Sequence, residues 1–152
     1  MAKTQNIYDL LDRTIDSLRQ RDKYSQDNWL QFLHSAAWNY KQPFISQVLI
    51  YAQRPDATAC APFGTWTSKR IFNRKIRAGA KGIAVLDDSN PQLSLQYLFD
   101  ISDTVARKDS MPVPIWHMTS EKETVVRKLI FSEYFSDEAF ESAMELSPTD
   151  FF

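Results

Sequence analysis

The sequence has little cysteine and histidine. Its 152 residues include one cysteine, Cys60, and two histidines, His34 and His117. A single cysteine forms no internal disulfide, and these three side chains lack the close spacing of a zinc site. A nucleophilic Cys60 would need an activating base, and nothing in the spacing places one beside it. We therefore expect a buried, inert cysteine, no metal site and no cofactor.

Long hydrophobic runs are also missing. No apolar stretch approaches the roughly 20 residues that cross a bilayer, and the first 13 residues, MAKTQNIYDLLDR, have no apolar core of the signal-peptide type. We expect a cytoplasmic protein that does not contact a membrane.

Glycine is scarce, and two of the three glycines stand close together. Gly79 and Gly82 flank Lys81, which predicts a tight turn with positive φ or a close approach of two backbones. The segment from Gly79 to Gly82 lacks the longer glycine-rich pattern of a nucleotide-binding loop. No catalytic constellation appears elsewhere, so we expect a protein that is not an enzyme.

The composition is that of a folded domain, with 43% hydrophobic and 13% aromatic residues. A chain of this length falls within the usual size of one domain with one core. No internal repeat or low-complexity stretch divides it, and we expect a single domain over residues 1–152. The chain stops at Phe151 and Phe152 without a closing element, from which we expect a fragment of a longer protein.

Hydrophobic spacing predicts mainly helices, with two β-prone runs in the second half. The helices are expected over residues 5–19, 26–40, 43–53, 63–72, 120–134 and 137–145, and the strands over 83–86 and 95–101, joined by a turn at 87–91. Ser120 and Glu123 form a capping-box pattern for the helix at 120–134. The core face of that helix is assigned to Val125, Val126, Leu129 and Ile130. The predicted fold class is α+β, with helices packed on a small antiparallel β-sheet.

The net charge of −1 conceals an uneven distribution. Residues 41–82 hold eight basic side chains and one acidic one, whereas residues 83–152 hold five basic and thirteen acidic ones. Aromatic rings alternate with the cations of the basic segment. This combination is typical of proteins that bind single-stranded nucleic acid, in which the cations neutralise phosphates and the aromatic rings stack on unpaired bases. The predicted phosphate contacts are Lys69, Arg70, Arg74, Lys75, Arg77 and Lys81, together with Arg54. Trp66 and Tyr51 are the candidate stacking residues, although a core position is favoured for Trp66.

Several motifs in this region follow one another in an order that resembles a known family. Residues 51–60 (YAQRPDATAC), Trp66, residues 77–86 (RAGAKGIAVL) and residues 99–104 (FDISDT) are similar to the N-terminal domain of ArdC-type antirestriction proteins. The same order resembles a stretch near the start of large helicase and methylase-like proteins of conjugative elements. The resemblance covers most of residues 32–104.

The resemblance implies non-catalytic, sequence-nonspecific binding of single-stranded DNA, linked to antirestriction or to DNA transfer by a mobile genetic element. The sequence departs from the family in two ways. Ser46 stands where the family has asparagine, and no HExxH motif is present, so the family's zinc chemistry is not implied.

Two other interpretations of the basic segment remain open. It docks an acidic protein partner, such as another domain of a longer parent protein, or it pairs with the acidic C-terminal part of its own chain. Exposed ion pairs of the second kind would add little stability.

Overall fold

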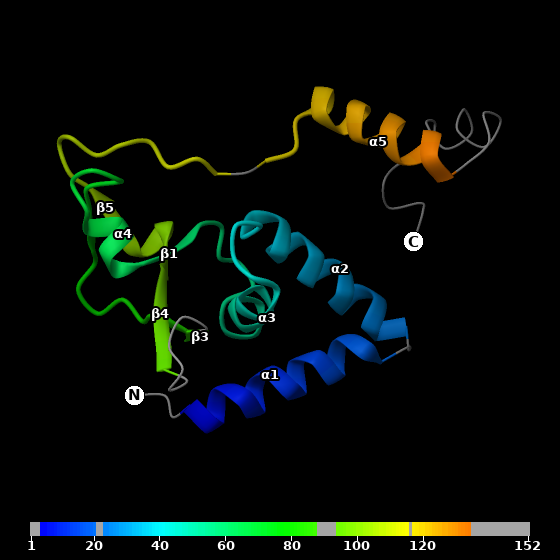
Figure 1. The fold of residues 1–152 in the computed structure, drawn as a ribbon, viewed down its shortest axis with the longest axis horizontal. Coiled ribbons are helices and arrows are strands. Elements are labelled where there is room, and N and C mark those ends of the chain that lie inside the picture. The colour runs from blue at the N-terminus through cyan, green and yellow to red at the C-terminus, as the bar shows by residue number, and fades with distance from the viewer. Residues whose placement is uncertain (1–3, 21–22, 88–93, 116, 135–152) are drawn as a thin grey trace. The chain divides into compact units, whose positions relative to one another are not determined.

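The computed structural model describes residues 4–20, 23–87, 94–115 and 117–134 (Figure 1). The chain divides into two compact units, residues 1–116 and 117–152. The first unit holds the basic segment, and the second holds one described helix. The expectation of one domain over residues 1–152 stays a prediction.

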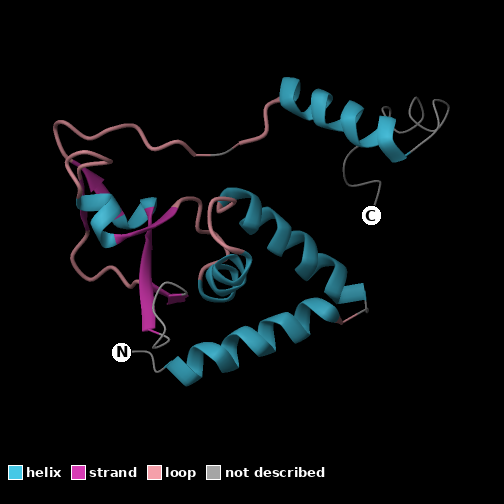
Figure 2. Ribbon diagram, viewed as in Figure 1, coloured by secondary structure: helices cyan, strands magenta, loops and turns pink. Residues whose placement is uncertain are grey.

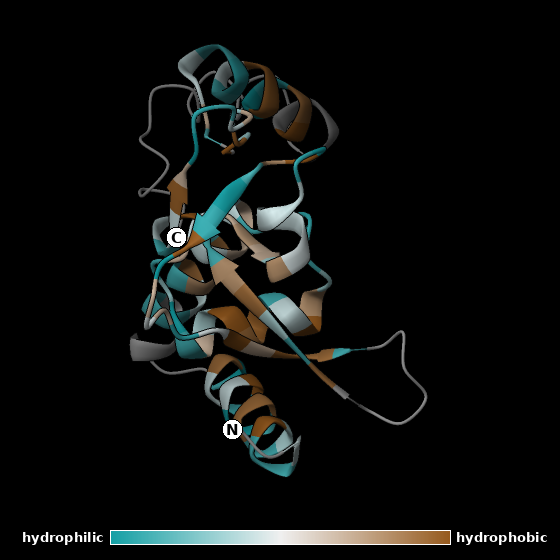
Figure 3. Ribbon diagram, turned by 90° about the vertical axis from the view of Figure 1, so that its left-hand side faces the viewer, coloured by the Kyte–Doolittle hydropathy of each residue, from teal (hydrophilic) through white to brown (hydrophobic). Residues whose placement is uncertain are grey.

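Three helices form one layer of the first unit. They are α1 (Thr4–Arg19), α2 (Lys23–Trp38) and α3 (Phe44–Gln53). α1 buries Ile7 and Leu11, one helical turn apart, and its ribbon beside the N label in Figure 3 carries brown and teal residues in alternation, as an amphipathic helix does. α3 is apolar on more than one side, and it lies between the sheet and the other two helices (Figures 1 and 2).

The strands form two antiparallel groups in the described part of the chain. A three-stranded sheet has the order β1-β4-β3, from β1 (Cys60–Pro62), β4 (Ser94–Asp100) and β3 (Ile83–Asp87). A two-stranded ribbon pairs β2 (Arg74–Ile76) with β5 (Thr104–Ala106). The short helix α4 (Phe63–Thr67) packs between β1 and β2, and the 3-10 turn η1 (Ile101–Asp103) connects β4 to β5. The predicted α+β class is confirmed.

The core lies where α3 meets the sheet. Val48, Leu49 and Ile50 of α3 are completely buried, and they share one cluster with residues of α1, α2, β1, β3 and β4. The members from the other elements include Ile7, Leu11, Phe32, Cys60, Ile83, Ala84, Val85 and Leu98.

Both glycine predictions at residues 79–82 are confirmed. Gly79 has a φ of +81°, which favours glycine over residues with a Cβ. A Cβ added to Gly82 would lie 3.0 Å from the Cβ of Tyr97, so the side chain of Tyr97 on β4 lies close to the backbone of Gly82.

The fourth helix is shorter than predicted. α4 ends at Thr67 instead of residue 72, and a turn follows in which Asn73 donates from its backbone to the Ser68 carbonyl. Arg70 therefore lies in this turn and not in the helix. The strands β1, β2 and β5 were not predicted. Each spans only three residues, which is too short to show the alternation of apolar and polar residues that marks a strand.

The described part of the second unit is the helix α5 (Ser120–Tyr134), as predicted. Its cap is Thr119, whose hydroxyl accepts from the Lys122 backbone, so the capping box assigned to Ser120 was wrong by one residue. The core face assigned to this helix is also wrong, since its four apolar residues are exposed: Val125, Val126, Leu129 and Ile130. The helix predicted at 137–145, and residues 88–91 of the predicted turn, lie outside the described residues. No helix among the described residues is long and apolar enough to cross a membrane.

Candidate nucleic-acid interface

The antiparallel pairing of β2 with β5 sets the geometry of the basic region. Arg74 lies opposite Ala106, Lys75 opposite Val105, and Ile76 opposite Thr104. At one end of this ribbon the Arg77 backbone donates to the Asp103 carbonyl at 2.8 Å. Residues 74–77 and 103–106 are therefore held side by side although about 30 positions separate them in the chain.

A tight turn after β5 is fastened to the other end of the ribbon. The Ser110 hydroxyl donates to the Asn73 carbonyl at 2.7 Å and accepts from the Arg107 backbone at 2.6 Å. The Met111 backbone also donates to the Phe72 carbonyl. These bonds place the turn at residues 107–110 beside residues 72 and 73.

The ribbon and its two adjoining turns gather seven basic residues, which we call the basic ribbon: Lys69, Arg70, Arg74, Lys75, Arg77, Arg107 and Lys108. All except Arg74 are exposed. Arg107 and Lys108 were not predicted, because only the pairing of β2 with β5 brings them to the other five. The three residues Thr104–Ala106 are too few to give a strand pattern in the sequence, so no local signal indicated this pairing.

Arg74 is tied to the fold more closely than its neighbours in the basic ribbon. Its Nε donates to the Thr104 hydroxyl at 2.6 Å, and its side chain is half-buried. Thr104 in turn donates to the Ile101 carbonyl at 2.7 Å. Arg74 therefore helps to hold the two strands together, and Lys75 and Arg77 are the more accessible cations of β2.

Lys81 lies in the segment that leads into β3, after the turn in which the Ala80 backbone donates to the Arg77 carbonyl. It is exposed, and it lines a shallow hollow together with Arg54, Gly79 and Asp103. The structure thus brings five of the predicted phosphate contacts into the basic ribbon and places Lys81 and Arg54 at this second location.

Arg54 is engaged in an ion pair within the fold. Its Nη1 lies 2.6 Å from Oδ2 of Asp103, and its Nη2 donates to the Ser102 hydroxyl at 2.8 Å. The positive charge of Arg54 is therefore largely balanced by Asp103, which makes this residue a weaker candidate for phosphate contact than its position in the basic segment predicts.

Neither candidate stacking residue presents a free ring. Trp66 is 1% exposed, and its indole nitrogen donates to the Phe99 carbonyl at 2.8 Å. Tyr51 is half-buried, with its hydroxyl donating to the Asn28 carbonyl at 3.3 Å and its ring 5.7 Å from that of Phe32. The prediction that Trp66 belongs to the core is confirmed. We therefore withdraw both rings from the set of nucleic-acid contacts.

The carboxylate of Asp100 joins two of the sequence motifs, at residues 51–60 and 99–104. Its Oδ1 accepts from the backbones of Thr58 and Ala59 at 2.8 and 2.9 Å, and its Oδ2 accepts from the backbone and the hydroxyl of Ser102. Burial raises the pKa of Asp100, but these hydrogen bonds outweigh burial and lower the pKa below its ordinary value. The two motifs therefore meet in the fold, where these hydrogen bonds satisfy the buried carboxylate of Asp100.

The surroundings of Cys60 agree with the prediction of a buried cysteine. Burial raises the pKa of the thiol to about 12, so the reactive thiolate is scarce at neutral pH. Among the described residues, no group of three or more histidine, cysteine, aspartate or glutamate side chains is placed to hold a metal ion.

Comparison with known proteins gives no further assignment. No protein-family model, no curated protein and no solved structure matches this chain. The resemblance to the ArdC N-terminal domain therefore remains a prediction that depends on the motifs quoted above.

Proposed function

We propose that the first unit binds single-stranded nucleic acid, DNA in particular, without sequence specificity and without catalysis, through the basic ribbon. The observation that carries the proposal is the pairing of β2 with β5, which gathers seven cations around one short ribbon. Lysine and arginine side chains that neutralise phosphates supply most of the free energy of nonspecific binding.

The balance of charge around the basic ribbon supports a polyanionic partner. Asp103 is already paired with Arg54, and Asp109, in the turn beside Asn73, is the exposed carboxylate of this region. Six of the seven cations are exposed, and none of the seven forms an ion pair with a carboxylate of the described residues. The excess of positive charge in this part of the chain is therefore available to a ligand.

Exposed apolar side chains of the ribbon, of the turn before it and of α4 favour a single strand over a duplex. Phe63 at the start of α4 is 57% exposed, and Ile71 and Val105 are also exposed. Unpaired bases present flat apolar faces that such side chains contact, whereas a duplex hides these faces in its stack. Phe63 thus replaces Trp66 as the proposed stacking ring.

The resemblance to the ArdC N-terminal domain supports a role of this binding in a protein of a conjugative transposon or plasmid. We extend the proposal accordingly to a cytoplasmic role in antirestriction or DNA transfer, with the domain acting inside a longer parent protein.

The proposal is tested by fluorescence anisotropy with a labelled 20-nucleotide single strand and the corresponding duplex. The test variant is Lys75→Ala/Arg77→Ala, and the matched control is Arg13→Ala/Arg19→Ala, which removes two exposed arginines from α1. We expect tighter binding of the single strand than of the duplex, a loss of at least tenfold in the test variant, and little change in the control.

The rival function is docking of an acidic protein partner. An intact, folded protein that binds neither oligonucleotide at low salt would contradict the proposal and favour this rival. Equal losses in the test and control variants would show that binding depends on overall charge and not on the basic ribbon.

A further inference from the structure

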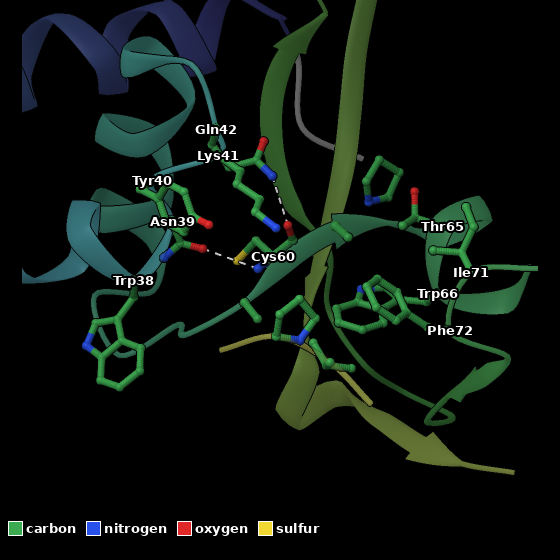
Figure 4. A pocket seen from close by; sticks show the side chains of 15 residues that line it. Trp38, Asn39, Tyr40, Lys41, Gln42, Cys60, Thr65, Trp66, Ile71 and Phe72 are labelled. Atoms are coloured by element: carbon green, nitrogen blue, oxygen red, sulfur yellow. Dashed lines mark hydrogen bonds between the residues drawn. The ribbon is translucent and has the colours of Figure 1, made fainter. Parts of the chain in front are cut away.

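A pocket of about 370 Å³ lies between the turn that follows α2 and the chain from β1 to Phe72. Figure 4 shows Tyr40 and Lys41 on one side of it, with Ile71 and Phe72 opposite. This volume falls in the range of pockets that hold small molecules or parts of larger ligands.

The framework of the pocket is fixed by hydrogen bonds to the outer edge of β1. The Cys60 backbone donates to Oδ1 of Asn39 at 3.2 Å, and Nε2 of Gln42 donates to the Cys60 carbonyl at 2.8 Å (Figure 4). Asn39 is buried and also donates to the Ala57 carbonyl. Amide side chains thus occupy the strand edge, so the position of the neighbouring Tyr40 and Lys41 is preorganised.

The opposite wall is held by an aromatic contact in the core. The ring centroids of Trp66 and Phe72 lie 5.1 Å apart, and Trp66 is anchored through its bond to Phe99. Ile71 projects beside this pair and is 45% exposed. The wall therefore combines a rigid base with an accessible apolar surface.

The wall formed by Tyr40 and Lys41 suits a ligand that has a flat ring and a negatively charged group attached to it. Tyr40 is 56% exposed, and the Lys41 ammonium lies 5.6 Å from the centroid of its ring. An aromatic ring that is accessible to ligand stacks with a nucleobase, and an adjacent ammonium attracts the phosphate of the same nucleotide.

The pocket is continuous with the basic ribbon. Ile71 directly follows Arg70 and precedes Arg74 by three residues, so at most roughly 10 Å of backbone separates the pocket wall from β2. From this continuity we infer that the pocket receives one unstacked base of a single strand whose phosphates lie along the basic ribbon. The inference rests on the proposed function and adds base capture to phosphate binding.

The experiment compares two labelled 12-nucleotide strands with the same backbone, one of thymidine and one in which abasic tetrahydrofuran replaces every nucleoside. The protein variants are Tyr40→Ala, Tyr40→Phe and Ile71→Asp. Phe44→Ala is the control, because Phe44 is a similarly exposed ring that does not line the pocket.

We expect the wild-type protein to bind the thymidine strand about tenfold more tightly than the abasic strand. Tyr40→Ala and Ile71→Asp should each lower this ratio severalfold, whereas Tyr40→Phe and Phe44→Ala should retain it. Affinity of Tyr40→Ala for the abasic strand should stay at the wild-type value, which shows that the variant is folded and binds phosphates.

Equal affinity of the wild-type protein for both strands would overturn base capture and leave the proposed function standing. A ratio that survives both Tyr40→Ala and Ile71→Asp would overturn it as well, because the base would then be held elsewhere. Failure of the wild-type protein to bind either strand at low salt would overturn the proposed function itself, and base capture with it.

Discussion

The side-chain amide of Gln53 forms two reciprocal hydrogen bonds with the backbone of Ala84. Nε2 of Gln53 donates to the Ala84 carbonyl at 2.8 Å, and the Ala84 backbone donates to Oε1 of Gln53 at 3.0 Å. These are the two bonds that a residue of a neighbouring strand would form at the outer edge of β3. One glutamine at the end of α3 therefore joins the helical layer to the sheet and occupies an open strand edge.

Removal of this amide should destabilise the fold. For Gln53→Ala we expect the free energy of unfolding to fall by about 1–3 kcal/mol, because the polar backbone groups of Ala84, a buried residue, lose their partners. Urea denaturation measures the change. Gln96→Ala, which removes an exposed glutamine from β4, is the control and should change stability by less than about 0.5 kcal/mol. Equal effects of the two substitutions would show that the amide of Gln53 does not hold the strand edge.

The buried carboxylate of Asp100 should make stability depend on pH in the acidic range. Its pKa is lower in the folded protein than the value of about 3.9 expected in the unfolded chain. Its contribution is therefore complete above about pH 4 and is lost as the pH falls through the folded-state pKa. Asp100→Asn should be less stable than wild type at pH 7, and the difference should shrink below pH 4.

Urea midpoints at pH 7, 5, 4 and 3 measure this dependence. Asp56→Asn is the control, because the Asp56 side chain is 83% exposed and its contact with Arg54 is 3.9 Å long. A constant difference between wild type and Asp100→Asn over the whole range would contradict the assigned pKa direction.

Because of the close contact at Gly82, we expect the substitution Gly82→Ala to destabilise the protein. In Gly82→Ala the new methyl group would meet the Tyr97 side chain at 3.0 Å, so that side chain must shift and the melting temperature should fall. Gly64→Ala in α4 is the matched control, because no atom lies within 4 Å of its added Cβ. Alanine favours helices over glycine, so this control should be neutral or slightly stabilising. Equal melting temperatures of the two variants would refute the close approach.

The backbone of Asn73 leads into β2 with a φ of +49°, a conformation that asparagine and glycine adopt more readily than β-branched residues. Asn73→Gly should therefore keep both stability and strand binding. Asn73→Val should lower the free energy of unfolding by about 1–2 kcal/mol and weaken binding, since it disturbs the start of the basic ribbon. Thermal unfolding and anisotropy on the same samples check both effects, and a fully stable Asn73→Val would contradict the account.

Local patterns in the sequence predicted the parts of the fold that depend on near neighbours. α1, α3 and α5 follow from hydrophobic spacing, and β3 and β4 from β-prone runs beside a turn. The turn at Gly79 and the close approach at Gly82 were predicted because glycine is favoured where the backbone has a positive φ or where another group lies close to it. These signals are contained within a few consecutive residues.

The parts that were not predicted depend on contacts between distant residues. The position of Arg107 in the basic ribbon follows from the pairing of Arg74 with Ala106, and no periodicity in a three-residue strand indicates that pairing. The indole nitrogen of Trp66 donates to the carbonyl of Phe99, 33 positions later, and no local pattern indicates that contact. Composition correctly identified a basic segment with aromatic rings, but burial decides which of those rings a ligand reaches.

The salt dependence of single-strand binding tests the central claim most directly. The account predicts that the logarithm of the association constant falls linearly with the logarithm of salt concentration, because each neutralised phosphate releases counterions. In Lys75→Ala/Arg77→Ala the slope should decrease by about 0.7 for each cation removed, and in Arg13→Ala/Arg19→Ala it should match the wild type. An affinity that does not change with salt, or a slope that the Lys75 and Arg77 substitutions leave unchanged, would contradict phosphate binding by the basic ribbon.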